Sequence, residues 1–151
     1  MSHLRKQIRD AVASTLNNLD TTEERVYVSR VYPMERTNLP GLIIMTNSDE
    51  ADYTYATDYA NGVKLWSKLQ LIVKAYAKNT AQVDDDLDQI ELEVREALAM
   101  NKKLNGLTKD ITWLKTDIAL DGSGEKPIGV AEMQFRVDYR VTDNTLDTAI
   151  D

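Results

Sequence analysis

Residues 63–79, VKLWSKLQLIVKAYAKN, constrain the fold most, because their apolar side chains fit either of two regular periods. With a period of two, nearly all odd positions are apolar, and the even positions mix lysine, glutamine and aromatic residues. With a helical period, Leu65, Leu69 and Tyr76 also share one side. The two interpretations predict different folds, so the flanking sequence has to decide between them.

The flanking residues favour a long strand over residues 63–77. The preceding segment, 51–62, alternates tyrosine and threonine with acidic or small residues and ends in Asn61-Gly62. This dipeptide is preferred in tight type I′ hairpin turns, because both central residues need a positive φ. A helix here would also expose Leu71 and run into the helix predicted after it. We therefore predict a β-hairpin whose second strand is 63–77.

Two amphipathic helices are predicted on either side of this hairpin. The first covers about residues 2–19, with apolar side chains every three or four positions and Ser2 as its N-cap. The second begins after Thr80, its expected N-cap, and continues to about Met100. Aspartates 84–86 lie in its first turn, where the helix dipole favours negative charge. Each helix has one apolar stripe that has to be buried.

The remaining apolar segments are typical of strands, and they complete an α+β fold. They are residues 25–32, 41–46, 111–120 and 127–141. The polar run 47–50 is predicted to turn the chain, as are Gly106 and the glycine-rich 121–124. The apolar-in, polar-out alternation of 127–141 is typical of an antiparallel strand with one covered face. We predict a mainly antiparallel sheet with two helices packed on one face.

The predicted hairpin is long for a domain of this size. About fifteen strand residues extend roughly 50 Å at ~3.3 Å each, whereas a compact domain of 151 residues has a radius of gyration near ~15 Å. We therefore expect the hairpin to project past the core. Residues 1–142 are predicted to form this single domain, and the small, acidic residues 143–151 to form a flexible C-terminal tail.

Composition excludes several classes of site. The chain has no cysteine, so it forms no disulfide and no thiolate metal site. Its net charge of −7 argues against general affinity for nucleic acid, although it suits a surface that DNA must pass without being held. No segment has the length and apolarity of a secretory signal or a membrane span, so we expect neither.

Few residues offer catalytic or metal-binding chemistry. The single histidine, His3, lies near the N-terminus, where we expect a solvated surface group and neither a histidine-based triad nor a histidine metal cluster. The acids Asp84, Asp86 and Asp88 have the spacing of a calcium loop, but Gln89 and Arg95 stand where that loop needs glycine and glutamate. Ser123 and Lys126 match a Ser-x-x-Lys pattern, but on a glycine-rich turn. We expect no catalytic, cofactor-binding or metal site, and no enzymatic activity.

Three alternatives remain open from the residues alone. The first is a small enzyme that uses carboxylates such as Asp84 or Glu91. The second is a nucleic-acid-binding module that uses the basic start of the first helix, Arg5, Lys6 and Arg9. The third is weak binding of divalent ions by the acids near residue 86.

An aromatic group on the predicted hairpin is the strongest candidate for a partner surface. Aromatic side chains mixed with lysine give a large contact area and keep a polar tip. The alternative is that these side chains only support a twisted sheet or pack under the helices. The candidate interface residues are Tyr53, Tyr55, Tyr59, Trp66, Lys68 and Tyr76.

Over residues 3–141 the chain resembles the tail terminator proteins of long-tailed bacteriophages, the lambda-type minor tail protein U family. The resemblance lies in the order and spacing of several segments. These are the amphipathic opening helix, RVY, LPGLIIM, the tyrosine-bearing segment, WSKLQLIVKAY, TAQVDDDLDQIELEVREAL and AEMQFRVDYRV. Other tail and neck proteins share a related α+β plan, so another ring-forming tail-tube or neck protein is the alternative within this class.

The resemblance implies a structural role in the virion. Proteins of this kind assemble in the host bacterial cytoplasm as a six-membered homo-oligomeric ring on the head-proximal end of the tail tube. The ring stops addition of tail tube protein and presents a surface for the head-completion (connector) protein. DNA later passes through the lumen without specific binding. The expected partners are thus other copies of the chain, the tube protein and the connector, with no membrane.

Overall fold

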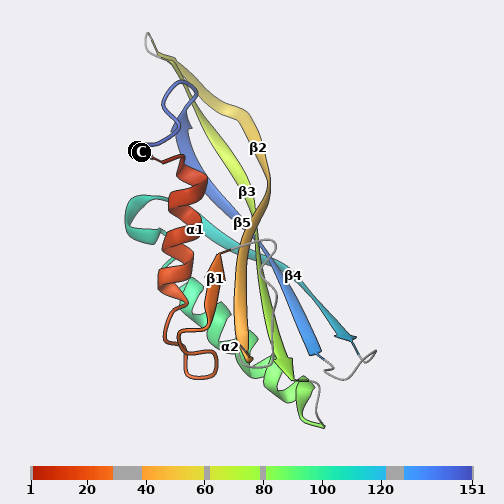
Figure 1. Cartoon of the computed structure of the whole chain (residues 1–151). Coiled ribbons are helices and arrows are strands. Elements are labelled where there is room, and N and C mark those ends of the chain that lie inside the picture. The colour runs from red at the N-terminus through yellow and green to blue at the C-terminus, as the bar shows by residue number, and fades with distance from the viewer. Residues whose placement is uncertain (1, 29–38, 60–61, 79–80, 122–127, 151) are drawn as a thin grey trace.

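The computed structural model describes residues 2–28, 39–59, 62–78, 81–121 and 128–150, and within them it confirms the α+β class (Figure 1). The longer elements are one five-stranded sheet and two α-helices. In chain order they are α1 (Leu4–Thr15), β1 (Val26–Val28), β2 (Gly41–Tyr59), β3 (Gly62–Lys78), α2 (Val83–Ala99), β4 (Asp110–Asp121) and β5 (Ile128–Thr142). A short 3-10 turn, Leu104–Gly106, joins α2 to β4.

The sheet has the strand order β1-β2-β3-β5-β4, and β3 lies at its centre. The opening segment of the sequence is therefore a strand, and it pairs along its length with both β2 and β5. All strand pairs are antiparallel except β1 with β2. Both helices lie on the same side of the sheet (Figure 1). We call this side the covered face and the opposite side the open face.

The covered face follows from the two sequence periods. Odd-numbered residues of β3 such as Leu69 and Val73 are fully buried against the helical stripes, which include Ile8 of α1 and Ile90 of α2. The predicted alternation of β5 is confirmed, because every odd-numbered residue from Ala131 to Val141 is buried. Fully burying a large aliphatic side chain contributes about 1.5–3 kcal/mol, so this face supplies most of the hydrophobic stabilisation.

A smaller apolar cluster lies on the open face. It consists of Ile43, Met45 and Ile72, with Tyr27 and Tyr76 packed against it. Leu42 and Ile44, which alternate with Ile43 and Met45 along β2, belong to the main core. The apolar run 41–46 is therefore buried on both faces, as its continuous hydrophobicity predicts.

The turn predicted at residues 47–50 is wrong, because β2 continues through it to Tyr59. Instead, the register against β3 shifts between Thr46 and Asp49. A β-bulge accommodates polar residues while the strand goes on, and hydrogen bonds stabilise this one: Asn47 Nδ2 donates to Gln70 Oε1 at 2.9 Å. Asn61 lies outside the described residues, whereas Gly62 opens β3 with a φ of 129°.

The ends of the helices differ from the predicted ones. α1 begins at Leu4 with His3, not Ser2, as its cap: the His3 Nδ1 accepts from the Arg5 backbone N–H at 3.0 Å. α1 also ends at Thr15 instead of residue 19. Thr80 lies outside the described residues, and Gln82, directly before α2, makes no side-chain cap. Gly106 has a φ of 94°, as expected for a left-handed turn after α2.

The residues after β5 return to the start of α1, where the C-terminal end of the chain also lies (Figure 1). The Leu4 backbone N–H donates to the Leu146 carbonyl at 2.9 Å, and Gln7 Nε2 donates to the Asp147 carbonyl at 2.8 Å. The Ile150 backbone N–H donates to the Arg140 carbonyl at 3.1 Å. The domain boundary at 142 and the flexibility of 143–151 stay predictions. No helix in the described part of the chain is long and apolar enough to cross a membrane.

Candidate subunit interface

The end of the β2–β3 hairpin extends past α1 and β5 (Figure 1). Tyr53 and Tyr55 lie in this part of β2, and their side chains are 63% and 75% exposed. Tyr59 is the last residue of β2 and pairs with Gly62, but its side chain is not among those described. Two large, exposed aromatic side chains two residues apart on a projecting strand are the pattern expected of a contact surface.

The other three candidates, Trp66, Lys68 and Tyr76, lie on the open face of β3. The Arg140 guanidinium is 5.6 Å from the centre of the Trp66 ring. Lys68 Nζ is 3.3 Å from an Asp52 carboxylate oxygen. Trp66 and Tyr76 are ten residues apart, roughly 33 Å along a strand, so the structure does not gather the six candidates at one point.

Tyr76 differs from Trp66 because it belongs to the small apolar cluster of the open face. Burial, and then the nearby Glu132 carboxylate, raise the pKa of its hydroxyl group. This tyrosine supports the sheet as well as offering part of a surface. The selection of the six residues as an interface stays a prediction.

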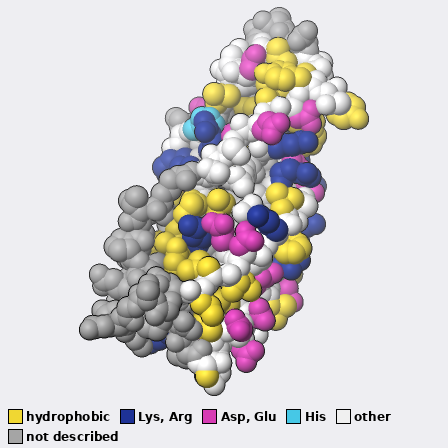
Figure 2. All heavy atoms as spheres, turned by 90° about the vertical axis from the view of Figure 1, so that its right-hand side faces the viewer, with side chains coloured by type: hydrophobic (Ala, Val, Ile, Leu, Met, Phe, Trp, Pro, Cys, Tyr) yellow, Lys and Arg dark blue, Asp and Glu magenta, His cyan; other side chains and the backbone are white. Residues whose placement is uncertain are grey.

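Charges of both signs alternate along the open face (Figure 2). Lys74 Nζ lies 3.7 Å from Glu132 on the neighbouring strand, and Arg136 Nε lies 3.2 Å from Asp138. The Lys74–Glu132 pair, with both side chains about a third exposed, contributes little to the stability of one molecule, because water screens it. The arrangement of these charges can nevertheless select the orientation of a partner with a complementary pattern.

A buried polar network fixes the place where the hairpin leaves the core. Ser67 Oγ donates to Asp49 Oδ1 at 2.6 Å, and the Tyr139 hydroxyl donates to Asp49 Oδ2. Arg5 Nε lies 3.6 Å from the same Asp49 oxygen. Burial raises the pKa of the Tyr139 hydroxyl, and the hydrogen bond to Asp49 raises it further. The network joins β2, β3, β5 and α1 directly beside the bulge.

Sequence analysis missed this network, although one signal was present. Tyr139 belongs to the inward-facing series of β5, where the other members have no polar group to satisfy. A buried tyrosine hydroxyl needs a hydrogen-bond partner, so a polar group had to lie near it. The sequence does not say which one, because Asp49 is 90 residues away.

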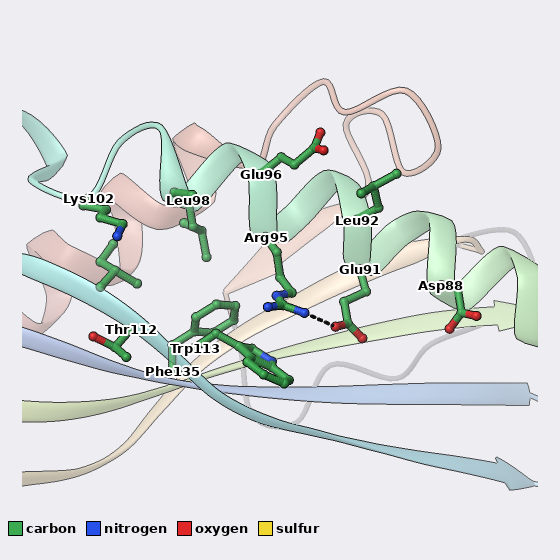
Figure 3. A pocket seen from close by; sticks show the side chains of 12 residues that line it. Asp88, Glu91, Leu92, Arg95, Glu96, Leu98, Lys102, Thr112, Trp113 and Phe135 are labelled. Carbon is green, nitrogen blue, oxygen red and sulfur yellow. Dashed lines mark hydrogen bonds and ion pairs between the residues drawn. The ribbon is translucent and has the colours of Figure 1, made fainter.

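A groove of about 600 Å³ lies between α2 and β4 (Figure 3). The Arg95 guanidinium stacks 3.8 Å from the centre of the Trp113 ring and bonds Glu91 Oε1 at 3.1 Å. Leu92, at the rim, is 50% exposed. We call this feature the α2–β4 groove. The sequence did not predict this groove. The large apolar residues of 111–120 are odd-numbered at Trp113 and even-numbered at Ile118, and this change is the sequence signal of the bulge after Trp113.

Little in this geometry favours the alternatives based on catalysis, metal binding or nucleic acid. Glu91 forms an ion pair with Arg95. The described residues contain no group of three or more histidine or acidic side chains placed to hold a metal ion. The basic start of α1 is likewise engaged. Arg5 approaches Asp49, Lys6 Nζ lies 2.7 Å from Asp10 Oδ2, and Arg9 Nη1 donates to Thr46 Oγ1 at 2.9 Å.

Comparison with known proteins now gives the family. Residues 3–139, which include both helices and most of the sheet, match the family model described as phage minor tail protein U. One similar solved chain comes from a structure titled "Virion of native gene transfer agent (GTA) particle", with a TM-score of 0.49, 14% identity and 92% of each chain covered. No curated protein matches significantly. Because the match spans most of the sequence, the chain belongs to the phage minor tail protein U family.

Proposed function

We propose that this structural protein of the phage tail forms a six-membered ring on the head-proximal end of the tail tube. The ring stops elongation of the tube and offers the head-completion protein a surface to join. Membership of the minor tail protein U family is the observation that carries the proposal. The open face and the exposed Tyr53 and Tyr55 support it, because they supply surface beyond what one folded chain needs.

A ring of identical subunits needs two different surfaces on each copy. A head-to-tail contact is repeated by rotation, and the assembly closes when the rotation divides a full turn. A projecting hairpin is suited to one half of such a contact, since it reaches beyond its own core (Figure 1). Trp66 and Lys68, on the open face near the same end, extend the surface that a neighbour would meet.

The charge of the chain suits passage of DNA through the ring. Six copies with a net charge of −7 each sum to about −40. Negative side chains around the lumen would repel the phosphate backbone, so DNA would pass without being held. This part of the proposal expects no measurable DNA binding even at low salt.

The capping function is tested by adding the purified protein to growing tail tubes and measuring tube length by electron microscopy. A terminator leaves short tubes with a ring at one end, and their length stops increasing. If the protein instead elongates the tubes or joins them along their walls, it is a tube or neck component and the capping proposal is wrong.

Ring formation is tested by sedimentation over a range of protein concentrations. The wild-type chain should sediment as a hexamer, and Trp66→Ala should shift the equilibrium towards monomer about tenfold or more, as expected for an aromatic residue central to an interface. Lys103→Ala, an exposed change outside the hairpin, is the matched control. Equal assembly of Trp66→Ala and the control would exclude Trp66 from the interface.

A further inference from the structure

The outer margin of the covered face is left without a cover. β4 is the last strand in the sheet order, and among the described strands it pairs only with β5. Ile118 and Leu120 pair with Ala131 and Gly129, which are buried, so they point to the same side of the sheet as the helices. They are nevertheless 51% and 52% exposed. The α2–β4 groove thus continues along β4 as an apolar strip that no part of the described chain fills.

An exposed apolar strip beside an edge strand indicates a binding site for a partner. Soluble proteins usually protect edge strands with charges, prolines or bulges. β4 has a bulge after Trp113, but the protection that its described side chains give beyond the bulge is one exposed pair, Lys115 with Asp117 at 3.1 Å. Half-exposed leucine and isoleucine side chains next to a groove of about 600 Å³ are the pattern of a contact surface.

The same chain carries a segment of matching character on the opposite edge. Residues 50–57 of β2, which we call the tyrosine segment, present Tyr53 and Tyr55 at 63% and 75% exposure. Lys115 and Asp117 pair with Gln134 and Glu132, so both charges point to the opposite side of β4 from the strip. An aliphatic strip is complementary to a pair of tyrosines, because it can bury their rings while the hydroxyl groups stay at the edge.

These two surfaces cannot meet within one molecule. β3 and β5 lie between β2 and β4, which separates the two strands by about 14 Å at ~4.8 Å per strand spacing. The tyrosine segment also lies towards the projecting end of the hairpin, away from α2 (Figure 1). A contact between them must join two copies, and because the two surfaces differ, it is head-to-tail.

We propose that the tyrosine segment of one copy lies in the α2–β4 groove of the next copy around the ring. The inference rests on the proposed ring and names the two surfaces that build it. Two tyrosines bury roughly 300–500 Å² together, which is about half of the ~800 Å² per partner in a stable interface. The rest comes from the strip along β4 and the side chains that line the α2–β4 groove.

The chain has no cysteine, so the contact can be tested by introducing pairs of them. Tyr55→Cys and Ile118→Cys are prepared as two separate proteins, mixed, and treated with a short bismaleimide linker. The expected product is a covalent dimer with one copy of each variant. A chain with both substitutions should give a ladder of bands that ends at the ring size. Both sites are exposed, and thermal unfolding of each variant checks that folding is unchanged.

Leu146→Cys, at another exposed apolar residue (45%), is the control partner for Tyr55→Cys. If rings form by sedimentation but the Tyr55–Ile118 pair links no better than the Tyr55–Leu146 pair, the proposed contact is wrong and the ring stands. If the protein forms no ring at any concentration, alone or on tail tubes, the proposed function fails and this contact fails with it.

Discussion

The two faces of β3 show how one strand serves two purposes. Its odd-numbered side chains, from Leu65 to Ala77, lie in the main core and are almost all apolar. The even-numbered ones mix lysine, glutamine and aromatic residues, and most stay half-buried on the open face. The backbone is the same for both, so the difference lies only in what each face meets. Burial decides the first set, whereas most of the second set keeps part of its surface exposed.

This difference predicts that the two faces respond unequally to mutation. A covered residue is surrounded by packed neighbours, and removing its side chain leaves a cavity as well as a loss of buried apolar area. An open-face side chain in the single molecule loses only screened charge interactions and part of its packing. Stability should therefore report on the buried side chains of the covered face, and assembly should report on the exposed side chains of the open face and of the strip along β4.

The largest effect is expected for Leu69→Ala in the middle of the covered face. Leu69 is fully buried, so truncation should lower the free energy of unfolding by about 2–5 kcal/mol. Lys74→Ala, on the open face of the same strand, is the matched control and should change it by less than about 1 kcal/mol. Urea denaturation of both variants measures the two values. Losses of similar size would mean that the faces do not differ as described.

The covered face was the part that could be predicted from the sequence. Helices and strands that share one core must repeat their apolar residues at their own period, so α1, α2, β3 and β5 were all visible in the pattern. The segment at 47–50 was not, because Asn47 to Glu50 have the composition of a turn. Its strand conformation depends on pairing with β3 and on the distant Tyr139, neither of which leaves a local signal.

A smaller effect is expected where the covered face ends, at the Asp49 network. Tyr139→Phe removes the hydroxyl that donates to Asp49 and should lower the free energy of unfolding by about 1–2 kcal/mol, because Asp49 keeps Ser67 as a donor. Asp49→Ala should lower it by more, since it leaves both hydroxyl groups without their acceptor. A double-mutant cycle in urea denaturation measures the coupling. Additive losses would show that the two residues act independently.

The interface was predictable only in part. An aromatic, lysine-bearing strand indicates a partner surface, and Tyr53 and Tyr55 are indeed exposed. However, the sequence pattern of the even-numbered face of β3 does not distinguish a side chain that packs within the molecule, as Tyr76 does, from one that contacts a neighbouring molecule. The α2–β4 groove escaped notice because Leu92 and Trp113 come from separate elements, and only the fold brings them to one groove. Which of these residues a partner contacts depends on the surface of the partner.

The smallest effect concerns pH, at a carboxylate on the open face. Hydrogen bonds from the Thr54 side chain and backbone, and then the nearby Lys68, lower the pKa of Asp52 from 3.8 to about 2. Because the folded pKa lies below the unfolded one, ionised Asp52 stabilises the folded state above 3.8, and this contribution disappears as the pH falls through about 2. Asp52→Asn should thus differ from the wild type at neutral pH and converge with it in strong acid.

The measurement is the difference in urea midpoint between the wild type and Asp52→Asn at a series of pH values, since the difference removes the acid sensitivity that both proteins share. Asp117→Asn is the control, because Asp117 also pairs with a lysine on an exposed strand but has no counterpart to Thr54 among its described hydrogen bonds. It should show a smaller difference at neutral pH. A midpoint difference for Asp52→Asn that persists unchanged to pH about 2 would mean that the Thr54 hydrogen bonds do not favour the ionised carboxylate. The residue would then shape the exposed end of the hairpin through sterics alone, and the open face would lose its best-defined electrostatic feature.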